Sequence, residues 1–319
     1  MACLGDYFGK QHPGELQIKD LECGKLVDGD SAAALSPPDD FDMDKFHRGR
    51  RFFRDNLFSC SVAMYFSLII GMSVPEFLEA LVFTEQSDTP AKAFQRFAKT
   101  FHHVALWHYG NVWEKDSNAQ KSICQVRQMH KMVREQMKKR YEGRGTHKFI
   151  SQYDMGVVQS GFMGAVIMYP EDGGIRCTLD DLDDYVYFWY GVGHLLGIEK
   201  KYNICAHGLT QALTFCRSIE QDIVKKYIAN PPPEFHHLTE NVIQAFQGGS
   251  WPVTILTFPV VSALSYEYIM GESGKLSLAD TVRYLIWKLI FFGIKHISSF
   301  RMFMNQRIER KSRLIFLNE

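Results

Sequence analysis

Helix-start signals recur along this chain, and no segment alternates apolar and polar residues as a half-buried strand would. Residues 58–71 are apolar almost throughout, and this run is too short to cross a bilayer, so it predicts a buried helix. We therefore predict an all-α fold. Small polar caps or early prolines precede several helical patterns: Asp42, Ser73-Val74-Pro75, Thr89-Pro90, Ser117-Asn118 and Ser151.

The 319 residues allow one large domain or two closely packed ones, and we predict a single large helical domain with additional helices. Residues 1–40 mix Gly, Pro, Asp and Ser, which predicts an extended, partly ordered N-terminal arm. Residues 41–270 then form the helical domain. Residues 271–319 are expected to form a C-terminal amphipathic helix and a basic tail.

Composition narrows the class of protein. A formal net charge of zero argues against a general nucleic-acid binder. The seven cysteines are scattered without a C-x-x-C pair, which excludes a cysteine zinc knuckle and makes a disulfide framework unexpected. The first residues show neither a basic stretch nor an apolar signal segment. We expect an intracellular protein, either cytoplasmic or peripherally bound to a membrane.

The segment 278–303 is apolar but carries several cations, and residues 275–319 contain nine Lys and Arg against three Asp and Glu. These charges argue against a spanning helix and favour an amphipathic one. Such a helix docks either on the domain or on an anionic membrane surface, and docking on the domain is our first expectation. The cations within it are Arg283, Lys288, Lys295, His296 and Arg301.

The most site-like arrangement pairs two neighbouring helices. Arg127 and His130 are three residues apart, so they share one face of a helix that ends near Tyr141. Asp154 is a lone carboxylate near the start of the next helix, which is otherwise uncharged. An Arg/His face beside a lone carboxylate predicts a site but names no reaction.

Three glycines, Gly156, Gly161 and Gly164, lie inside that second helix, where each costs about 1 kcal/mol relative to alanine. They predict that a neighbouring helix or a planar ligand approaches closely. In a helical chain rich in Phe, Met and lone histidines, haem is the most compatible cofactor, since it needs an axial His, an apolar slot and basic groups. His194 lies in an apolar run and is a candidate ligand, although such a histidine is more often part of a core.

Four segments resemble motifs of a known family, the rubber oxygenase (latex clearing protein) and ER-bound oxygenase of mycophenolic acid biosynthesis family. Gln95 to Thr100 resembles its R-F-x-x-T helix, and Val126 to His130 resembles its R-x-x-H motif. Ile150 to Met155 resembles S-Q-x-D-M, and Phe188 to Ile198 resembles W-x-x-x-G-x-x-L-G-I. The resemblance covers roughly residues 45–260.

The resemblance implies a globin-like helical core that holds haem b and cleaves C=C bonds of isoprenoid chains with O2. By motif, Arg127 is implied to orient or stabilise oxygen species, and His130 to lie on the distal side of the haem. Gln152 and Asp154 are implied to lie on the helix that faces the cofactor. Arg96 is a further cofactor-binding candidate.

One departure concerns the iron ligand. The bacterial members place a proximal His on the helix corresponding to residues 150–162, and this chain has none there. Met155 or Gln159 stands at that place. The iron ligand is therefore Met155, His130 or His194, or haem is not bound as in the bacterial enzymes.

The function we expect is a haem-dependent oxygenase that acts on a lipophilic, isoprenoid-like substrate with O2. Arg127 would stabilise negative charge on bound oxygen, and His130 or Asp154 would handle a proton. The segment 278–303 would provide peripheral membrane contact. The alternative is a non-catalytic helical relative that binds a lipophilic ligand or a protein partner.

Overall fold

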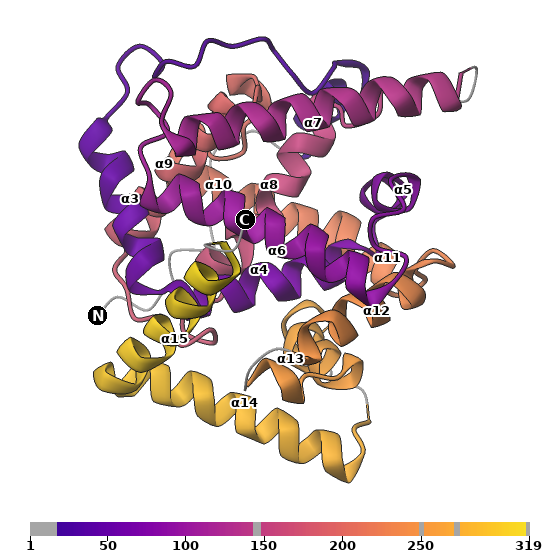
Figure 1. Cartoon of the computed structure of the whole chain (residues 1–319), viewed down its shortest axis with the longest axis vertical. Coiled ribbons are helices and arrows are strands. Elements are labelled where there is room, and N and C mark those ends of the chain that lie inside the picture. The colour runs from indigo at the N-terminus through magenta and orange to yellow at the C-terminus, as the bar shows by residue number, and fades with distance from the viewer. Residues whose placement is uncertain (1–17, 143–147, 249–251, 271–274, 317–319) are drawn as a thin grey trace.

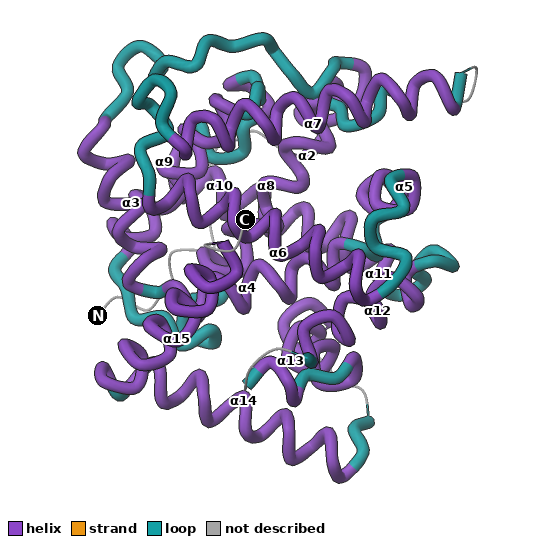
Figure 2. Tube along the Cα trace, viewed as in Figure 1, coloured by secondary structure: helices purple, strands orange, loops and turns teal. Residues whose placement is uncertain are grey.

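The computed structural model describes residues 18–142, 148–248, 252–270 and 275–316, and gives only the backbone of 266–270 and 311–316. Those ranges are helical and contain no strand beyond one isolated antiparallel bridge between Asp28 and Ser151 (Figure 2). The all-α prediction is confirmed. Residues 1–17 of the predicted arm lie outside the described residues.

The N-terminal half contains the following elements: α2 (Ile18–Glu22), the 3-10 helix η1 (Cys23–Leu26), α3 (Met43–Asp55), α4 (Leu57–Gly71), α5 (Pro75–Phe83), α6 (Pro90–Tyr109), α7 (Asn118–Arg140) and α8 (Gln152–Met168). Their arrangement is shown in Figure 1. After α8 follow α9 (Leu179–Leu195), η2 (Lys200–Tyr202), α10 (Gly208–Ser218), a π-helical turn (Ile219–Val224), α11 (Lys225–Ile228), α12 (Phe235–Gln247), η4 (Val253–Ile255), α13 (Phe258–Met270), α14 (Leu278–His296) and α15 (Ser298–Phe316).

Local sequence signals set most helix starts. The side chains of Asp42, Thr89, Ser117 and Ser151 accept hydrogen bonds from backbone N–H groups of the turns they cap, as predicted. The predicted cap Ser73 is wrong. Val74 is the N-cap of α5, because Pro75 already provides the fixed φ of the first helical position.

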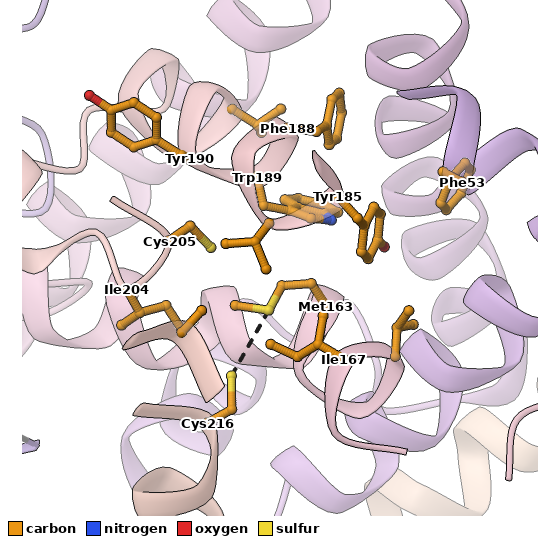
Figure 3. Close-up of a cluster of buried hydrophobic side chains, with 14 of the residues drawn as sticks. Phe53, Met163, Ile167, Tyr185, Phe188, Trp189, Tyr190, Ile204, Cys205 and Cys216 are labelled. Carbon is orange, nitrogen blue, oxygen red and sulfur yellow. Dashed lines mark hydrogen bonds between the residues drawn. The ribbon is translucent and has the colours of Figure 1, made fainter. Parts of the chain in front are cut away.

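The first of two hydrophobic cores surrounds α9. Figure 3 shows Tyr185 and Trp189 of this helix beside Met163 and Ile167 of α8, with Cys216 contributed by α10. All five side chains are at most 2% exposed. The dense packing around α9 fixes α8 relative to α3 and α10, and α8 carries several of the predicted site residues.

The second core lies between α4, α6, α12, α13 and α14, and Trp287 of α14 is fully buried in it. The predicted segment 278–303 is divided between α14 and α15, since α14 ends with Ile297 as its C-cap. α14 contacts the domain through the face that carries Ile290 and Ile294. The expected docking on the domain is therefore seen for this face.

Within the described ranges, no single helix is both long and apolar enough to cross a membrane. The helices α4 and α5 together meet the requirement for length and composition, with a bend of 93° between them.

His108 is a buried histidine that packs against aromatic residues of the first core. Its ring stacks on Phe53 at 3.6 Å between centroids and lies 4.0 Å from Phe188, and the side chain is 0% exposed. Burial lowers the pKa of His108 to about 3. The unfolded chain takes up this proton near pH 6.5 while the folded chain does not, so stability is lost as pH falls below about 6.5.

The free energy of unfolding of the parent protein falls between pH 7 and pH 5. We predict that this fall is smaller by about 2 kcal/mol in His108→Phe, which has no imidazole to protonate. Chemical denaturation of both proteins at the two pH values measures the difference. An unchanged pH dependence in the variant would show that His108 is protonated in the folded state.

Candidate functional site

Three of the four motif segments meet at residues 27–36, which we call the N-terminal strap. The strap runs above α7 and α9 in Figure 1. Its hydrogen bonds reach all three segments: Gln152 N–H donates to Val27 O (3.0 Å), Ser31 N–H to Gly197 O (2.9 Å) and Arg127 Nη1 to Ala33 O (2.8 Å). The strap therefore joins α7 to the start of α8 and the end of α9.

Arg127 and Asp30 form the ion pair that anchors the strap. The guanidinium donates to Asp30 Oδ1 through Nε at 2.9 Å and through Nη2 at 2.5 Å. Burial raises the pKa of Asp30, but the Arg127 hydrogen bond, the Ala32 N–H and two nearby arginine charges outweigh it and lower the pKa. The predicted role of Arg127 toward oxygen stays a prediction, and here its guanidinium binds the strap.

A hollow of about 320 Å³ lies beside this ion pair. Its lining is polar at most positions and comes from the strap and from the outer face of α7, namely Asp30, Ala32, Leu35, Cys124, Arg127, Gln128 and Lys131. His130 and the α8 candidates do not line it. The hollow is thus a groove beneath the strap, and Arg127 is the one predicted site residue in its lining.

Gln152 and Asp154 hold the start of α8. Gln152 is 0% exposed, and its Nε2 donates to Asp28 O (3.1 Å) and Gly197 O (2.9 Å). The Asp154 carboxylate accepts from the Ser151 N–H and hydroxyl at 2.8 and 2.9 Å, which completes a capping box. Burial raises the pKa of Asp154. Both side chains have structural partners, and their predicted roles in chemistry remain untested.

The loop before α8 is strained. Ile150 has a φ of +48°, a region that β-branched residues rarely adopt. Its carbonyl accepts a hydrogen bond from Arg134 Nε at 3.1 Å. A Cβ at Gly29 would lie 2.0 Å from the same oxygen, so the strap closes on it from the other side. Arg134 and Gly29 together hold the loop in this conformation.

Met155, Gln159 and His194 do not lie together. Gln159 Nε2 donates to Trp189 O at 2.8 Å, and Gly193 allows this approach because a Cβ there would lie 2.6 Å from the amide nitrogen. Met155 is 7% exposed within the first core. His194 instead contacts the strap, with Nε2 3.1 Å from Ser36 O. Among the three iron-ligand candidates of the sequence, His130 is the one with a buried side-chain nitrogen that makes no hydrogen bond within the described part of the chain.

His130 lies near two buried cations. Its Nδ1 is buried and has no hydrogen-bond partner among the described residues. Burial lowers its pKa to about 4, and the charges of Arg134 and Arg96 lower it further, so the imidazole is neutral at physiological pH. Burial also lowers the pKa of Arg96 to about 10. Arg96 donates to Thr84 Oγ1 at 2.6 Å, and no described carboxylate forms an ion pair with it.

The three glycines of α8 have different neighbours. A Cβ at Gly156 would lie 2.6 Å from Tyr202 O, and one at Gly164 would lie 3.2 Å from Cys216 Sγ. Neighbouring protein segments therefore explain these two. A Cβ at Gly161 would meet nothing within 4 Å, and this side of α8, with Val157 and Ala165, is only partly buried.

Two of these side chains, His130 and Arg96, are of the kinds that a haem site requires. A neutral imidazole can bind iron through a lone pair, and a haem requires only one axial ligand and basic groups for its propionates. His130 and Arg96 supply these two features. Within the described part of the chain, no three His, Cys, Asp or Glu side chains gather as a mononuclear metal site requires.

The comparisons with known proteins agree with the motifs. The family model described as "ER-bound oxygenase mpaB/B'/Rubber oxygenase, catalytic domain" matches residues 50–203. The match over residues 50–203 confirms the resemblance to that family. The match spans the four motif segments and ends before α10. No curated protein matches the chain.

Among solved structures, that of the latex clearing protein LCP in the closed state matches with a TM-score of 0.63 at 18% identity. The alignment covers 88% of this chain and 77% of that chain. At this identity the match shows a shared helical fold and nothing further. The strap and the helices α12 to α15 lie outside the segment that the family model matches.

The sequence did not predict Asp30 as a partner of this region. Arg127 was singled out by its spacing to His130, but its partner lies 97 positions earlier, in a segment with no helical periodicity. Arg134 follows Arg127 by two helical turns, so its place on the same face could be derived from spacing.

We predict that Gly29→Ala lowers the free energy of unfolding by about 1–3 kcal/mol, because the new methyl group must displace the Ile150 carbonyl. Gly173→Ala is the matched control, since a Cβ there has no neighbour nearer than 3.7 Å. Denaturant titration of the three proteins measures the effect. Equal stability of the two variants would mean that the strap does not press on this loop.

Proposed function

We propose that this chain is an oxygenase that uses haem and O2 to act on a lipophilic substrate. The match of residues 50–203 to an oxygenase catalytic-domain family supports the reaction class. The observation that carries the haem proposal is the buried Nδ1 of His130, which lacks a partner among the described residues and lies near Arg96. A buried polar group without a partner calls for an explanation, and a bound ligand is one such explanation.

In this proposal His130 would hold the haem iron, in place of the histidine that the bacterial members carry on the helix corresponding to α8. Its depressed pKa keeps a lone pair available at neutral pH. Arg96 and Arg134 would offset the carboxylate charges of the propionates. When bound, haem supplies the site at which O2 is activated.

The apolar side of α8 around Gly161 would pack against the flat face of the cofactor or the substrate chain. Val157 and Ala165 on the same side offer no hydrogen-bonding side chain. Such a surface excludes water from a reactive oxygen species. It also supports a lipophilic substrate, because apolar contacts favour apolar ligands.

One observation favours the alternative, a non-catalytic relative that binds a lipophilic ligand or a protein partner. Arg127, which the family resemblance assigns to oxygen, is bound to Asp30 of the strap. A hemin titration distinguishes the two functions. The oxygenase predicts a Soret band and one haem per chain by the pyridine haemochrome assay, and a colourless protein that takes up no hemin would contradict it.

We predict that His130→Ala weakens haem binding at least about 100-fold, since even outer-shell partners of a metal are worth about 10–100-fold. His194→Ala and Met155→Leu are controls that should retain haem, because His194 contacts the strap and Met155 lies in the core. Absorption spectra and hemin titrations of the three variants measure this. Loss of haem only in His194→Ala would transfer the ligand role to that residue.

We predict opposite effects of Gly161→Ala on stability and on haem uptake. Without haem the free energy of unfolding of the variant rises by up to about 1 kcal/mol, because alanine favours the helix and its methyl group meets open space. The variant binds haem less tightly than the parent does, because the methyl group intrudes on the face of the cofactor. Unchanged hemin affinity in a stabilised variant would show that haem does not contact α8 at this position.

A further inference from the structure

One face of α14 is apolar and exposed to solvent. Five side chains, spaced alternately by four and three residues, form what we call the α14 stripe: Leu278, Val282, Leu285, Leu289 and Phe292, all between 53% and 90% exposed. This spacing places them on a single side of the helix. The opposite side, with Trp287 and Ile290, is buried in the second core. Hence α14 is apolar on two sides, and only one of them is covered.

Further apolar side chains are exposed past the end of α14. Ile297, at the junction, is 52% exposed, and Met302 and Phe303 of α15 are 58% and 51% exposed. α14 runs along the lower edge of the molecule in Figure 1, and α15 turns back from its end. Single exposed apolar residues are ordinary, but a row of five on one helix face at the edge of the molecule indicates an interaction surface.

Positive charge accompanies the stripe. Lys288 and Lys295 follow Leu285 and Phe292 by three residues, so each lies beside the stripe on the helix surface. Residues 275–319 carry nine Lys and Arg against three Asp and Glu, in a chain whose formal net charge is zero. Lys295 also pairs with Glu171 at 2.9 Å. An apolar row with a basic flank matches the interface of an anionic bilayer, where cations meet headgroups and apolar side chains enter the acyl boundary.

We propose that the α14 stripe docks the protein on the surface of an anionic phospholipid bilayer, with α14 parallel to the membrane plane. A second copy of the chain fits this surface less well. In an antiparallel pair of copies the two basic flanks would lie on the same side and repel each other, and one helix face offers little area for a stable dimer. The docking does not depend on haem, so it can be tested separately from the proposed function.

Flotation of the full-length protein with lipid vesicles tests this surface. Vesicles of phosphatidylcholine with phosphatidylserine are compared with vesicles of phosphatidylcholine alone. We expect the protein to bind the anionic vesicles and to bind the neutral ones at least about fivefold more weakly, since each cation near an anionic surface contributes about that factor. Added salt should weaken binding to the anionic vesicles.

The double variant Leu289→Ser with Phe292→Ser should bind at least about tenfold more weakly, because two side chains that would enter the bilayer become polar. The matched control is Met129→Ser with Met132→Ser, which changes two exposed apolar side chains of α7 and should bind as the parent does. Circular dichroism and denaturant titration of both variants establish that they are folded.

Three results would overturn the docking. The first is a folded parent protein that does not float with anionic vesicles, and the second is a stripe variant that floats as well as the parent. The third is absent vesicle binding by a parent that light scattering shows to be a dimer while the stripe variant is a monomer, which would assign the surface to a second copy.

Discussion

The ion pair between Arg127 and Asp30 is the contact on which the arrangement of the motif segments depends. Both side chains are largely buried, and the guanidinium also binds a backbone carbonyl of the strap. A charge in such a position destabilises the fold unless a partner neutralises it. Each residue therefore requires the other, and their contact holds an extended segment across helices that are distant in sequence.

The same requirement explains the polar side chains around the strap. Gln152 uses its amide to bind Asp28 O and Gly197 O and accepts from the Glu199 N–H, so its polar atoms are satisfied. Asp154 caps α8 with its carboxylate. These contacts fix the start of α8 before any chemistry is considered. His130 and Arg96 differ, because burial lowers the pKa of both, and the described residues give neither His130 Nδ1 a hydrogen bond nor Arg96 a carboxylate partner.

Local features were predicted well from the sequence, and contacts between distant segments were not. The caps at Thr89 and Ser151 depend on a few neighbouring residues, so they could be derived from pattern alone. The pairing of Asp30 with Arg127 required knowing where an aperiodic segment runs. His194 illustrates the limit, since its apolar neighbours in sequence suggested a core position while its ring contacts the strap. For α14, an apolar pattern predicted docking but could not tell which face the domain covers.

A double-mutant cycle on Asp30→Ala and Arg127→Ala tests most directly whether this ion pair holds the strap to the helices. Denaturant titration of the parent, the two single variants and the double variant gives the coupling free energy of the pair. A largely buried, doubly hydrogen-bonded contact predicts a favourable coupling of about 1–2 kcal/mol, above that of exposed ion pairs. Additive effects of the two substitutions, with a coupling near zero, would contradict the account.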